Sequence, residues 1–175
     1  SPTGTGTVTV APDSTLTLGK SSVTTSMPGN ISYTGTLTGG TNTINIGSGQ
    51  LVKDTSGNLG IGVTPGTWDS AFKVEQIGAS TAVVGYSSGN YSYLSTNWRS
   101  ASGDKYISSG FATIYRQNDG THVWYYAPDN TSGGPGAPAT FTRAMSTDAS
   151  GNLAVGPSAP SGSYKLEVSG SVNAT

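Results

Sequence analysis

The chain of 175 residues contains one short segment twice, with the second copy 94 positions after the first. The first copy reads Asp-Thr-Ser-Gly-Asn-Leu-Gly-Ile-Gly from residue 54, and the second reads Asp-Ala-Ser-Gly-Asn-Leu-Ala-Val-Gly from residue 148. A loop that contains proline follows each copy, and then a short alternating segment, 72–75 or 164–167. Each unit is too small to bury a core by itself, so the repeat predicts an elongated and oligomeric β assembly.

Large apolar residues are scarce, since Leu, Ile, Val and Phe total 30 of the 175 residues. This share is below the one-fifth at which a chain has difficulty in burying a core. Disorder would also require a high net charge, but the net charge is −1 and charged residues make up 10% of the chain. A composition rich in Gly, Thr and Ser favours thin β structure, because Thr prefers strands and Gly permits tight turns.

The charges and the cysteine count exclude several classes of protein. The 8 Lys and Arg residues do not cluster, so no nucleic-acid partner is expected. No apolar run approaches the ~20 residues of a membrane helix, so no membrane insertion is expected. The absence of Cys excludes disulfides and Cys-based metal sites. Stability must therefore come from packing or from partner chains, and the chain is expected to be a segment of a longer protein.

Composition divides the chain into four parts. Residues 1–50 contain 29 Thr, Ser and Gly residues, with apolar residues at alternate positions, which predicts a stalk of short strands. A disordered Thr/Ser linker is the alternative, but a linker has no reason to alternate. The alternating pairs are Val8 and Val10, Leu16 and Leu18, Ile31 and Tyr33, and Ile44 and Ile46. The other parts are the first repeat unit (51–78), an inserted aromatic-rich β module (79–147), and the second repeat unit with the start of a missing C-terminal region (148–175).

Turn residues predict three hairpins. The first turns at residues 55–58 in the first repeat unit, and the second turns at 87–90 in the insert. The third turns at Asn118-Asp119-Gly120, which is the strongest of these signals because Asp-Gly adopts the tight turn that a hairpin needs. A Pro/Gly loop then leads to a further strand at 141–145. No segment has a convincing helical period, so the fold class is expected to be all-β.

No catalytic residue, metal site or cofactor is predicted. Each Asp-x-Ser-Gly-Asn turn offers one carboxylate, whereas a calcium loop needs several. His122 has no nucleophile motif to support a catalytic triad, although three copies meeting on a three-fold axis would resemble a metal site. No spacing pairs the carboxylates that glycosidic cleavage would require. The carboxylates considered are Asp69, Glu75, Asp104, Asp119, Asp129 and Glu167.

The insert contains 11 of the 15 aromatic residues. In its last hairpin, His122, Trp124 and Tyr126 alternate onto one face, whereas Val123 and Tyr125 alternate onto the other. Aromatic rings beside polar side chains commonly hold sugar rings, and the alternative is that these rings are simply the core of the insert. The hypothesised carbohydrate contact consists of Trp98, Arg99, Tyr106, Arg116, Asp119, Trp124 and Tyr126. The residues expected in the core are Tyr91, Phe111 and Val123.

The second copy of the repeat, with Pro160 and residues 164–170, resembles the repeat that recurs in bacteriophage tail fibres and tailspikes. The first copy, ending at Pro65, is more similar still. Residues 115–124 and 141–145 also resemble a segment common in such fibres. The resemblance covers residues 51–175, and the first 50 residues fit by composition alone. The second unit departs from the first by having Ala154 and Pro157 in place of Gly60 and Val63, so it is expected to be less regular.

The resemblance implies an elongated homotrimeric fibre on the virion, outside the cell, that joins other tail proteins and contacts polysaccharide on the host surface. In this family, residues such as 170–175 lead into a C-terminal chaperone that drives trimer formation and is then cleaved off. Two alternatives remain open. A fragment of a polysaccharide-degrading tailspike would need a long β-helix body, for which the chain has no room. The stalk of a bacterial trimeric adhesin would share the β repeats.

Overall fold

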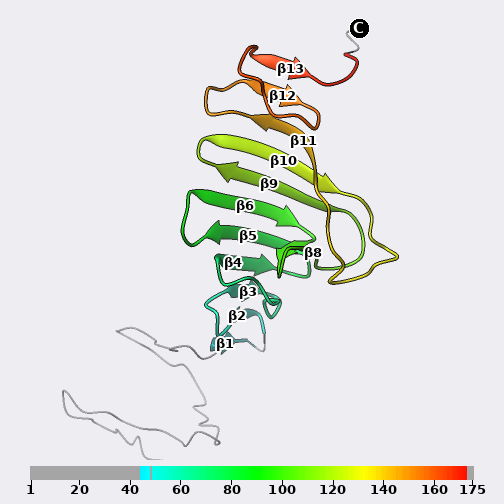
Figure 1. Cartoon of the computed structure of the whole chain (residues 1–175). Coiled ribbons are helices and arrows are strands. Elements are labelled where there is room, and N and C mark those ends of the chain that lie inside the picture. The colour runs from blue at the N-terminus through cyan, green and yellow to red at the C-terminus, as the bar shows by residue number, and fades with distance from the viewer. Residues whose placement is uncertain (1–43, 48, 173–175) are drawn as a thin grey trace, which may run out of the picture. The chain divides into compact units, whose positions relative to one another are not determined.

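The computed structural model describes residues 44–47 and 49–172, which belong to one compact unit (Figure 1). The strands expected before residue 44 lie outside the described residues. The described part of the chain forms thirteen strands and no helix, which confirms the all-β fold class. The strands are β1 (Ile44–Ile46), β2 (Leu51–Lys53), β3 (Leu59–Ile61), β4 (Phe72–Ile77), β5 (Thr81–Tyr86), β6 (Tyr91–Thr96), β7 (Trp98–Ser100), β8 (Asp104–Tyr106), β9 (Ala112–Asn118), β10 (Thr121–Ala127), β11 (Thr142–Thr147), β12 (Leu153–Val155) and β13 (Leu166–Val168).

Eleven of these strands form a single sheet in the order β1-β2-β3-β4-β5-β6-β9-β10-β11-β12-β13 (Figure 1). The order follows the chain, except that β7 and β8 pair with each other as a separate hairpin between β6 and β9. Neighbouring strands are antiparallel apart from β3–β4 and β12–β13, which are parallel. The sheet is therefore built almost entirely from connections between strands that are adjacent in sequence.

The inserted segment 79–147 contributes its strands to the same sheet as the two repeat units. Strand β5 pairs with β4 of the first unit, and β11 pairs with β12 of the second. The changes of composition near residues 79 and 147 therefore coincide with no break in the sheet. The strands β5, β6, β9, β10 and β11 have six or seven residues, whereas β2, β3, β12 and β13 have three.

All three hairpins expected from the turn residues are confirmed, as β2–β3, β5–β6 and β9–β10. In the tightest, Asn118 pairs with Thr121, so Asp119 and Gly120 form a two-residue turn with φ angles of 46° and 77°. Positive φ at both positions matches the twist of the two strands. Asp tolerates this conformation and Gly adopts it without steric cost.

The two copies of the repeat close their turns with the same hydrogen bonds. In the first copy, the carboxylate of Asp54 accepts from the backbone N–H and the side-chain amide of Asn58, at 2.8 and 2.9 Å. In the second, the carboxylate of Asp148 accepts from the same two groups of Asn152, at 2.9 and 2.8 Å. Asp and Asn recur at this spacing because the carboxylate of the Asp holds both the backbone N–H and the side-chain amide of the Asn.

A lysine that follows each turn in sequence ties the return segment back to it. Lys73 Nζ donates to the carbonyl oxygen of Ser56 at 2.6 Å. Lys165 Nζ donates to the carbonyl oxygen of Ser150 at 3.0 Å. The repeated sequence is therefore one structural unit, consisting of a hairpin and a parallel return strand held by its lysine.

The two units differ where the return loop crosses the sheet. In the first unit, loop 62–71 brings β4 parallel to β3, and its Pro65 is buried. A Cβ on Gly60 would lie 2.8 Å from Cδ of Pro65 and would overlap the carbonyl oxygen of Val63. The second unit carries that Cβ, on Ala154, so its loop cannot approach the strand as closely. The lower regularity expected of the second unit stays a prediction, and this contact is the place where the two units differ.

The sheet has one covered face and one bare face. Burial alternates along the strands, so that in β5 Ala82 and Val84 are buried whereas Val83 is 45% exposed. The covered face, to which Ala82 and Val84 belong, packs against loop 62–71, the β7–β8 hairpin and loop 128–141. The described residues place no segment over the bare face, where Val83 and Leu94 remain exposed.

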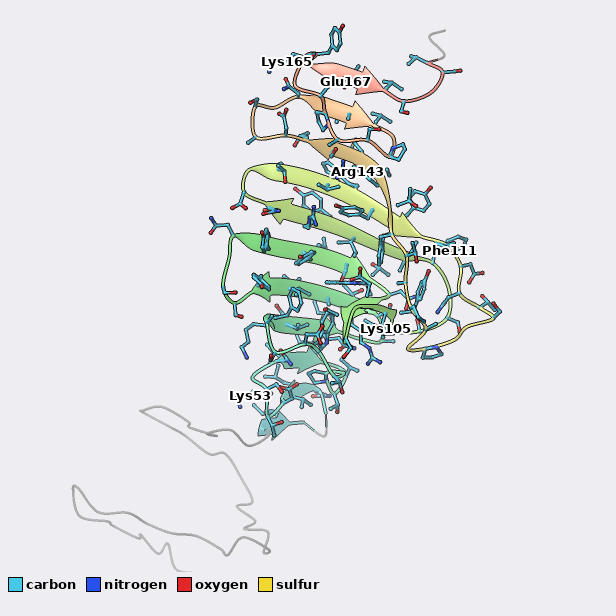
Figure 2. All side chains as sticks on the ribbon, viewed as in Figure 1. Lys53, Lys105, Phe111, Arg143, Lys165 and Glu167 are labelled. Carbon is cyan, nitrogen blue, oxygen red and sulfur yellow. The ribbon has the colours of Figure 1, made fainter. Side chains whose placement is uncertain are left out.

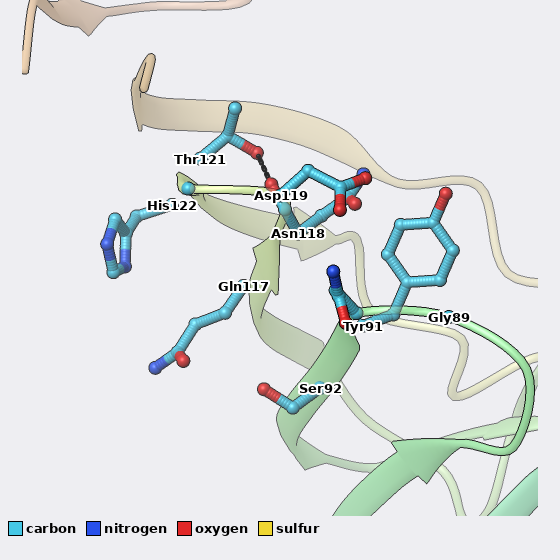
Figure 3. Close-up of a pocket in the computed structure, with 10 residues that line it drawn as sticks. Gly89, Tyr91, Ser92, Gln117, Asn118, Asp119, Thr121 and His122 are labelled. Atoms are coloured by element: carbon cyan, nitrogen blue, oxygen red, sulfur yellow. Dashed lines mark hydrogen bonds between the residues drawn. The ribbon is translucent and has the colours of Figure 1, made fainter. Parts of the chain in front are cut away.

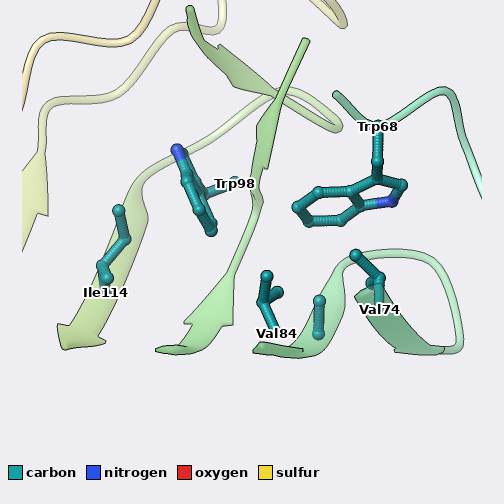
Figure 4. Packing of buried hydrophobic residues seen from close by; sticks show 6 residues of the cluster. Trp68, Val74, Val84, Trp98 and Ile114 are labelled. Atoms are coloured by element: carbon teal, nitrogen blue, oxygen red, sulfur yellow. The ribbon is translucent and has the colours of Figure 1, made fainter. Parts of the chain in front are cut away.

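The hydrophobic core lies between the covered face and these loops (Figure 4). Trp68 from the loop meets Trp98 from β7 edge to face, with ring centroids 5.7 Å apart. Val74 and Val84 of the sheet are buried beneath them. Burying each side chain of this size contributes roughly 1.5–3 kcal/mol. A second, smaller cluster is formed by Tyr106, Ala112 and Ala127.

We predict that Gly60→Ala lowers the free energy of unfolding by about 1–3 kcal/mol, because the added methyl group displaces the loop at Val63 and Pro65. Thermal unfolding followed by circular dichroism measures the effect. Ala154→Gly, at the matching position of the second unit, is the control and should cost only about 0.5–1 kcal/mol. Equal effects of the two substitutions would contradict the close approach at Gly60.

Candidate functional site

The β7–β8 hairpin places a tryptophan at the centre of an aromatic cluster on the covered face. Trp98 is 3% exposed, and its ring lies 5.2 Å from the ring of Tyr93 and 6.3 Å from that of Phe72. Its indole N–H donates to Oδ1 of Asp104 at 2.7 Å, across the hairpin. The indole N–H has its hydrogen-bond partner within the hairpin, so Trp98 contacts the other rings of the cluster through its apolar ring surface.

Asp69 of loop 62–71 anchors this hairpin. Its carboxylate accepts from the hydroxyl of Ser100 at 2.5 Å and from the backbone N–H of Ser102 at 2.9 Å. Its own N–H donates to the carbonyl oxygen of Ser100 at 2.8 Å. The hydrogen bond from the Ser100 hydroxyl, followed by that from Ser102, lowers the pKa of Asp69, because both stabilise the charged form.

Beside the hairpin, the covered face contains an open cavity of about 350 Å³, which we call the aromatic pocket. Arg116 lies at its side, with its guanidinium carbon 5.2 Å from the ring centroid of Tyr125. Burial raises the pKa of Tyr93, and the positive charge of Arg116 opposes that rise. The pocket is lined by Phe72, Tyr93, Trp98, Ser100, Asp104, Ile114, Arg116, Tyr125 and Phe141. Aromatic walls with a guanidinium and a carboxylate at the rim suit a ring that is apolar on its faces and polar at its edge.

A second cavity, of about 490 Å³, lies between the β5–β6 and β9–β10 turns (Figure 3). Its lining is polar and includes Ser92, Gln117 and Asp119. The hydroxyl of Thr121 in this turn already donates to the carbonyl oxygen of Asn118 at 2.6 Å. Tyr91 and His122 are the only rings among the residues that line this cavity, whereas Phe72, Tyr93, Trp98, Tyr125 and Phe141 line the aromatic pocket.

The bare face carries its own row of rings. Tyr115 lies between His122 and Trp124, with ring centroids 5.9 and 4.9 Å away. The hydroxyl of Tyr115 is hydrogen-bonded to Nδ1 of His122 at 2.5 Å. Tyr126 belongs to the same face and is 48% exposed. The alternation expected in β10 is thus confirmed, with Val123 and Tyr125 on the covered face.

The seven residues of the hypothesised carbohydrate contact lie in several places. Trp98 and Arg116 meet in the aromatic pocket, and Arg99 follows Trp98 on β7. Tyr106 is buried, and its hydroxyl donates to the carbonyl oxygen of Pro128 at 2.6 Å. The other three residues lie elsewhere: Asp119 lines the cavity between the β5–β6 and β9–β10 turns, and Trp124 and Tyr126 belong to the bare face.

Sequence analysis missed several residues of the aromatic pocket, among them Phe72, Tyr93, Asp104 and Phe141. Strand register is the signal that would have found Tyr93, because it is paired with Arg116 across β6 and β9. The β7–β8 hairpin was also missed. Its turn carries positive φ at Ser102 and Gly103, so the Ser-Gly pair was the local sign of it.

The three residues expected in the core differ in how deeply they are buried. Val123 is buried, at 3% exposure, as expected. Tyr91 is half-buried, with its ring 5.3 Å from that of Tyr86. The expectation for Phe111 is wrong, since its side chain is 68% exposed (Figure 2). Phe111 precedes β9 and its carbonyl oxygen accepts from the side-chain amide of Asn97, so the backbone is fixed while the ring points away.

Comparison with models of known protein families and with curated proteins found no match to this chain. Within the described residues, no three His, Asp or Glu side chains are grouped so as to hold a metal ion. The same part of the chain forms no helix that is long and apolar enough to cross a membrane.

We predict that acidification loosens the β7–β8 hairpin through Asp69. Its pKa is lower in the folded chain than in the unfolded one, so its stabilising effect is complete above the unfolded pKa of about 3.9. The effect is lost as the pH falls through the folded pKa, below that value. Asp69→Asn should cost about 1 kcal/mol at pH 7 and much less at pH 2.

Melting temperatures of the two proteins at pH 7, 4 and 2 measure this convergence. Asp119→Asn, in the exposed β9–β10 turn, is the matched control and should change little at any pH. A constant difference between wild type and Asp69→Asn over the whole range would show that the charge of Asp69 does not hold the hairpin.

Proposed function

We propose that this chain is a structural and receptor-binding segment of a homotrimeric bacteriophage tail fibre, whose receptor is a polysaccharide of the host surface. The bare apolar face of the sheet is the observation that carries the proposal. The phage origin rests on the resemblance of the repeat units, and the trimer on that resemblance together with the bare face. The chain acts by binding, without catalysis and without a cofactor.

The exposed apolar side chains are concentrated on the bare face. Among the described residues, ten of the thirteen exposed large hydrophobic residues belong to it, and only Phe111, Tyr164 and Val172 lie elsewhere. Scattered exposed apolar residues are ordinary, but a contiguous apolar patch marks an interaction surface. The ten residues are Ile46, Leu51, Ile61, Ile77, Val83, Leu94, Tyr126, Val155, Leu166 and Val168.

Strand register joins these residues into continuous rows. One row runs from Val83 and Leu94 through Tyr115 and Trp124 and on across β11, β12 and β13. Across β2, β3 and β4, Leu51, Ile61 and Ile77 form another row on the same face. Such rows suit the same face of neighbouring copies, because identical strands in parallel chains lie at the same level and place apolar rows opposite one another.

The covered face would then point outward, and with it the aromatic pocket. Tyr93, Tyr125 and Phe141 present ring surface to this cavity. A sugar ring stacked there would also meet Arg116 and Asp104, which supply hydrogen bonds to hydroxyl groups. In this arrangement Trp124 and Tyr126 serve the contact between chains, and the glycan contact consists of the aromatic pocket.

We predict that Leu94→Asp prevents assembly, because burying a carboxylate between apolar faces costs several kcal/mol for each chain. Leu94 is 53% exposed in the single chain, so the chain itself tolerates the change. Phe111→Asp is the matched control, since Phe111 is 68% exposed and lies outside the sheet. Light scattering should find trimers for wild type and the control and smaller species for Leu94→Asp; an unchanged trimer in Leu94→Asp would refute the bare face as the interface.

We predict that Tyr125→Ala weakens binding to host polysaccharide several-fold, because one stacked ring contributes about 1 kcal/mol beyond the area that it buries. The equivalent loss of the exposed ring of Tyr164 should leave binding unchanged. Titration calorimetry of both variants against a polysaccharide bound by the wild type measures the effect. Equal affinity of wild type and Tyr125→Ala, with trimers intact, would remove the aromatic pocket from the receptor site.

A further inference from the structure

A third cavity, of about 230 Å³, lies on β9, β10 and β11. We call it the basic pocket, because Arg116 and Arg143 both line it (Arg143 is labelled in Figure 2). Arg116 is paired with Val123 and Arg143 with Tyr125, so the two arginines flank β10 on the covered face. Arg116 also lines the aromatic pocket, so the two cavities meet at its side chain.

The basic pocket contains several buried polar atoms that have no partner. Five buried side-chain nitrogen or oxygen atoms of the described residues lack a hydrogen bond, and three of them belong to residues lining this pocket. The three are Nε of Arg116, Nε of Arg143 and Oγ of Ser146. Buried polar atoms in proteins are nearly always paired. Two arginines and one serine that carry unpaired polar atoms therefore line one cavity, and this makes the cavity a candidate site for a group that accepts hydrogen bonds.

The charges in this cavity are also unbalanced. Among the described residues, neither Arg116 nor Arg143 forms an ion pair with a carboxylate. Asp148 lies at the edge of the pocket, but its oxygens accept from Asn152 and from the backbone N–H of Ser150. Both arginines are half-buried, and a guanidinium group in such a place is well suited to bind an anion. Since no carboxylate of the described residues pairs with either of them, both are available to a negatively charged ligand.

We propose that the basic pocket binds the anionic group of an acidic saccharide, whose ring lies in the adjoining aromatic pocket. This inference rests on the proposed function, because that function makes the ligand a saccharide. Arg116 and Arg143 donate to the oxygens of the anion, and the Ser146 hydroxyl donates a further hydrogen bond. The ring stacks against the aromatic wall beside Tyr125, to which Arg116 is already held by its 5.2 Å cation–π contact.

The shared chemistry is a carboxylate or a phosphate attached to a sugar. The experiment is titration calorimetry of the full chain, in its native oligomeric state, with trigalacturonate and with its carboxyl-reduced neutral counterpart. Inorganic phosphate as a competitor distinguishes the two sources of the anion. Arg116→Gln and Arg143→Gln remove the proposed donors, and Lys105→Gln removes one charge from β8, outside both pockets.

We expect trigalacturonate to bind at least tenfold more tightly than the neutral trisaccharide. Added salt should weaken the binding of trigalacturonate but not that of the neutral trisaccharide. Each arginine substitution should reduce this affinity about tenfold, the loss expected for a charged hydrogen bond, whereas Lys105→Gln should not. Phosphate that competes with trigalacturonate at millimolar concentration would support an anion site of either chemistry, whereas phosphate that does not compete would assign it to carboxylates.

Equal affinities for the acidic and neutral trisaccharides would overturn the inference and leave the proposed glycan receptor intact. The absence of binding to either saccharide would also overturn it, and the oligomeric state, measured separately, would decide whether the fibre proposal survives. A third contrary result is a lower melting temperature of Arg116→Gln and Arg143→Gln with unchanged binding. The two arginines would then contribute to the stability of the fold and not to ligand binding.

Discussion

A sheet of eleven strands has two faces, and apolar side chains on either face must be removed from water. This chain has large apolar residues for both faces, but the loops within residues 44–47 and 49–172 cover only one. Each buried side chain of that size contributes roughly 1.5–3 kcal/mol, so a bare row such as Val83, Leu94 and Val155 leaves a large stabilisation unused in the single chain. The proposed assembly follows from this imbalance, since other copies of the sheet are the surfaces that match it in register.

The aromatic pocket on the covered face is formed by loops that pack against the sheet. Gly60 lets loop 62–71 lie close enough to place Trp68 in the core, and Asp69 of the same loop holds the β7–β8 hairpin. That hairpin brings Trp98 over the sheet and forms one wall of the aromatic pocket. A short loop in the first repeat unit thus positions residues of the insert, and the two are parts of one structure.

Local features of the fold could be predicted from the sequence. Turn residues such as Asp119 and Gly120 favour positive φ whatever surrounds them, so three hairpins were found, although that of β7 and β8 was missed. Alternation also separated Trp124 from Tyr125 correctly. Which of the two faces the loops would cover depends on contacts between distant segments, such as that of Trp68 with Trp98, and no local pattern records them. For that reason the sequence grouped Trp98 with Trp124, whereas the structure places them on opposite faces of the sheet.

In the proposed fibre, the bare face is the contact between copies of this chain. Sedimentation equilibrium of the purified chain measures whether the copies associate. We expect a single stable species with three times the chain mass of 17.6 kDa. A folded monomer of 17.6 kDa that persists at high protein concentration would contradict it, because the apolar rows from Leu51 to Val168 would then be exposed to water without a partner.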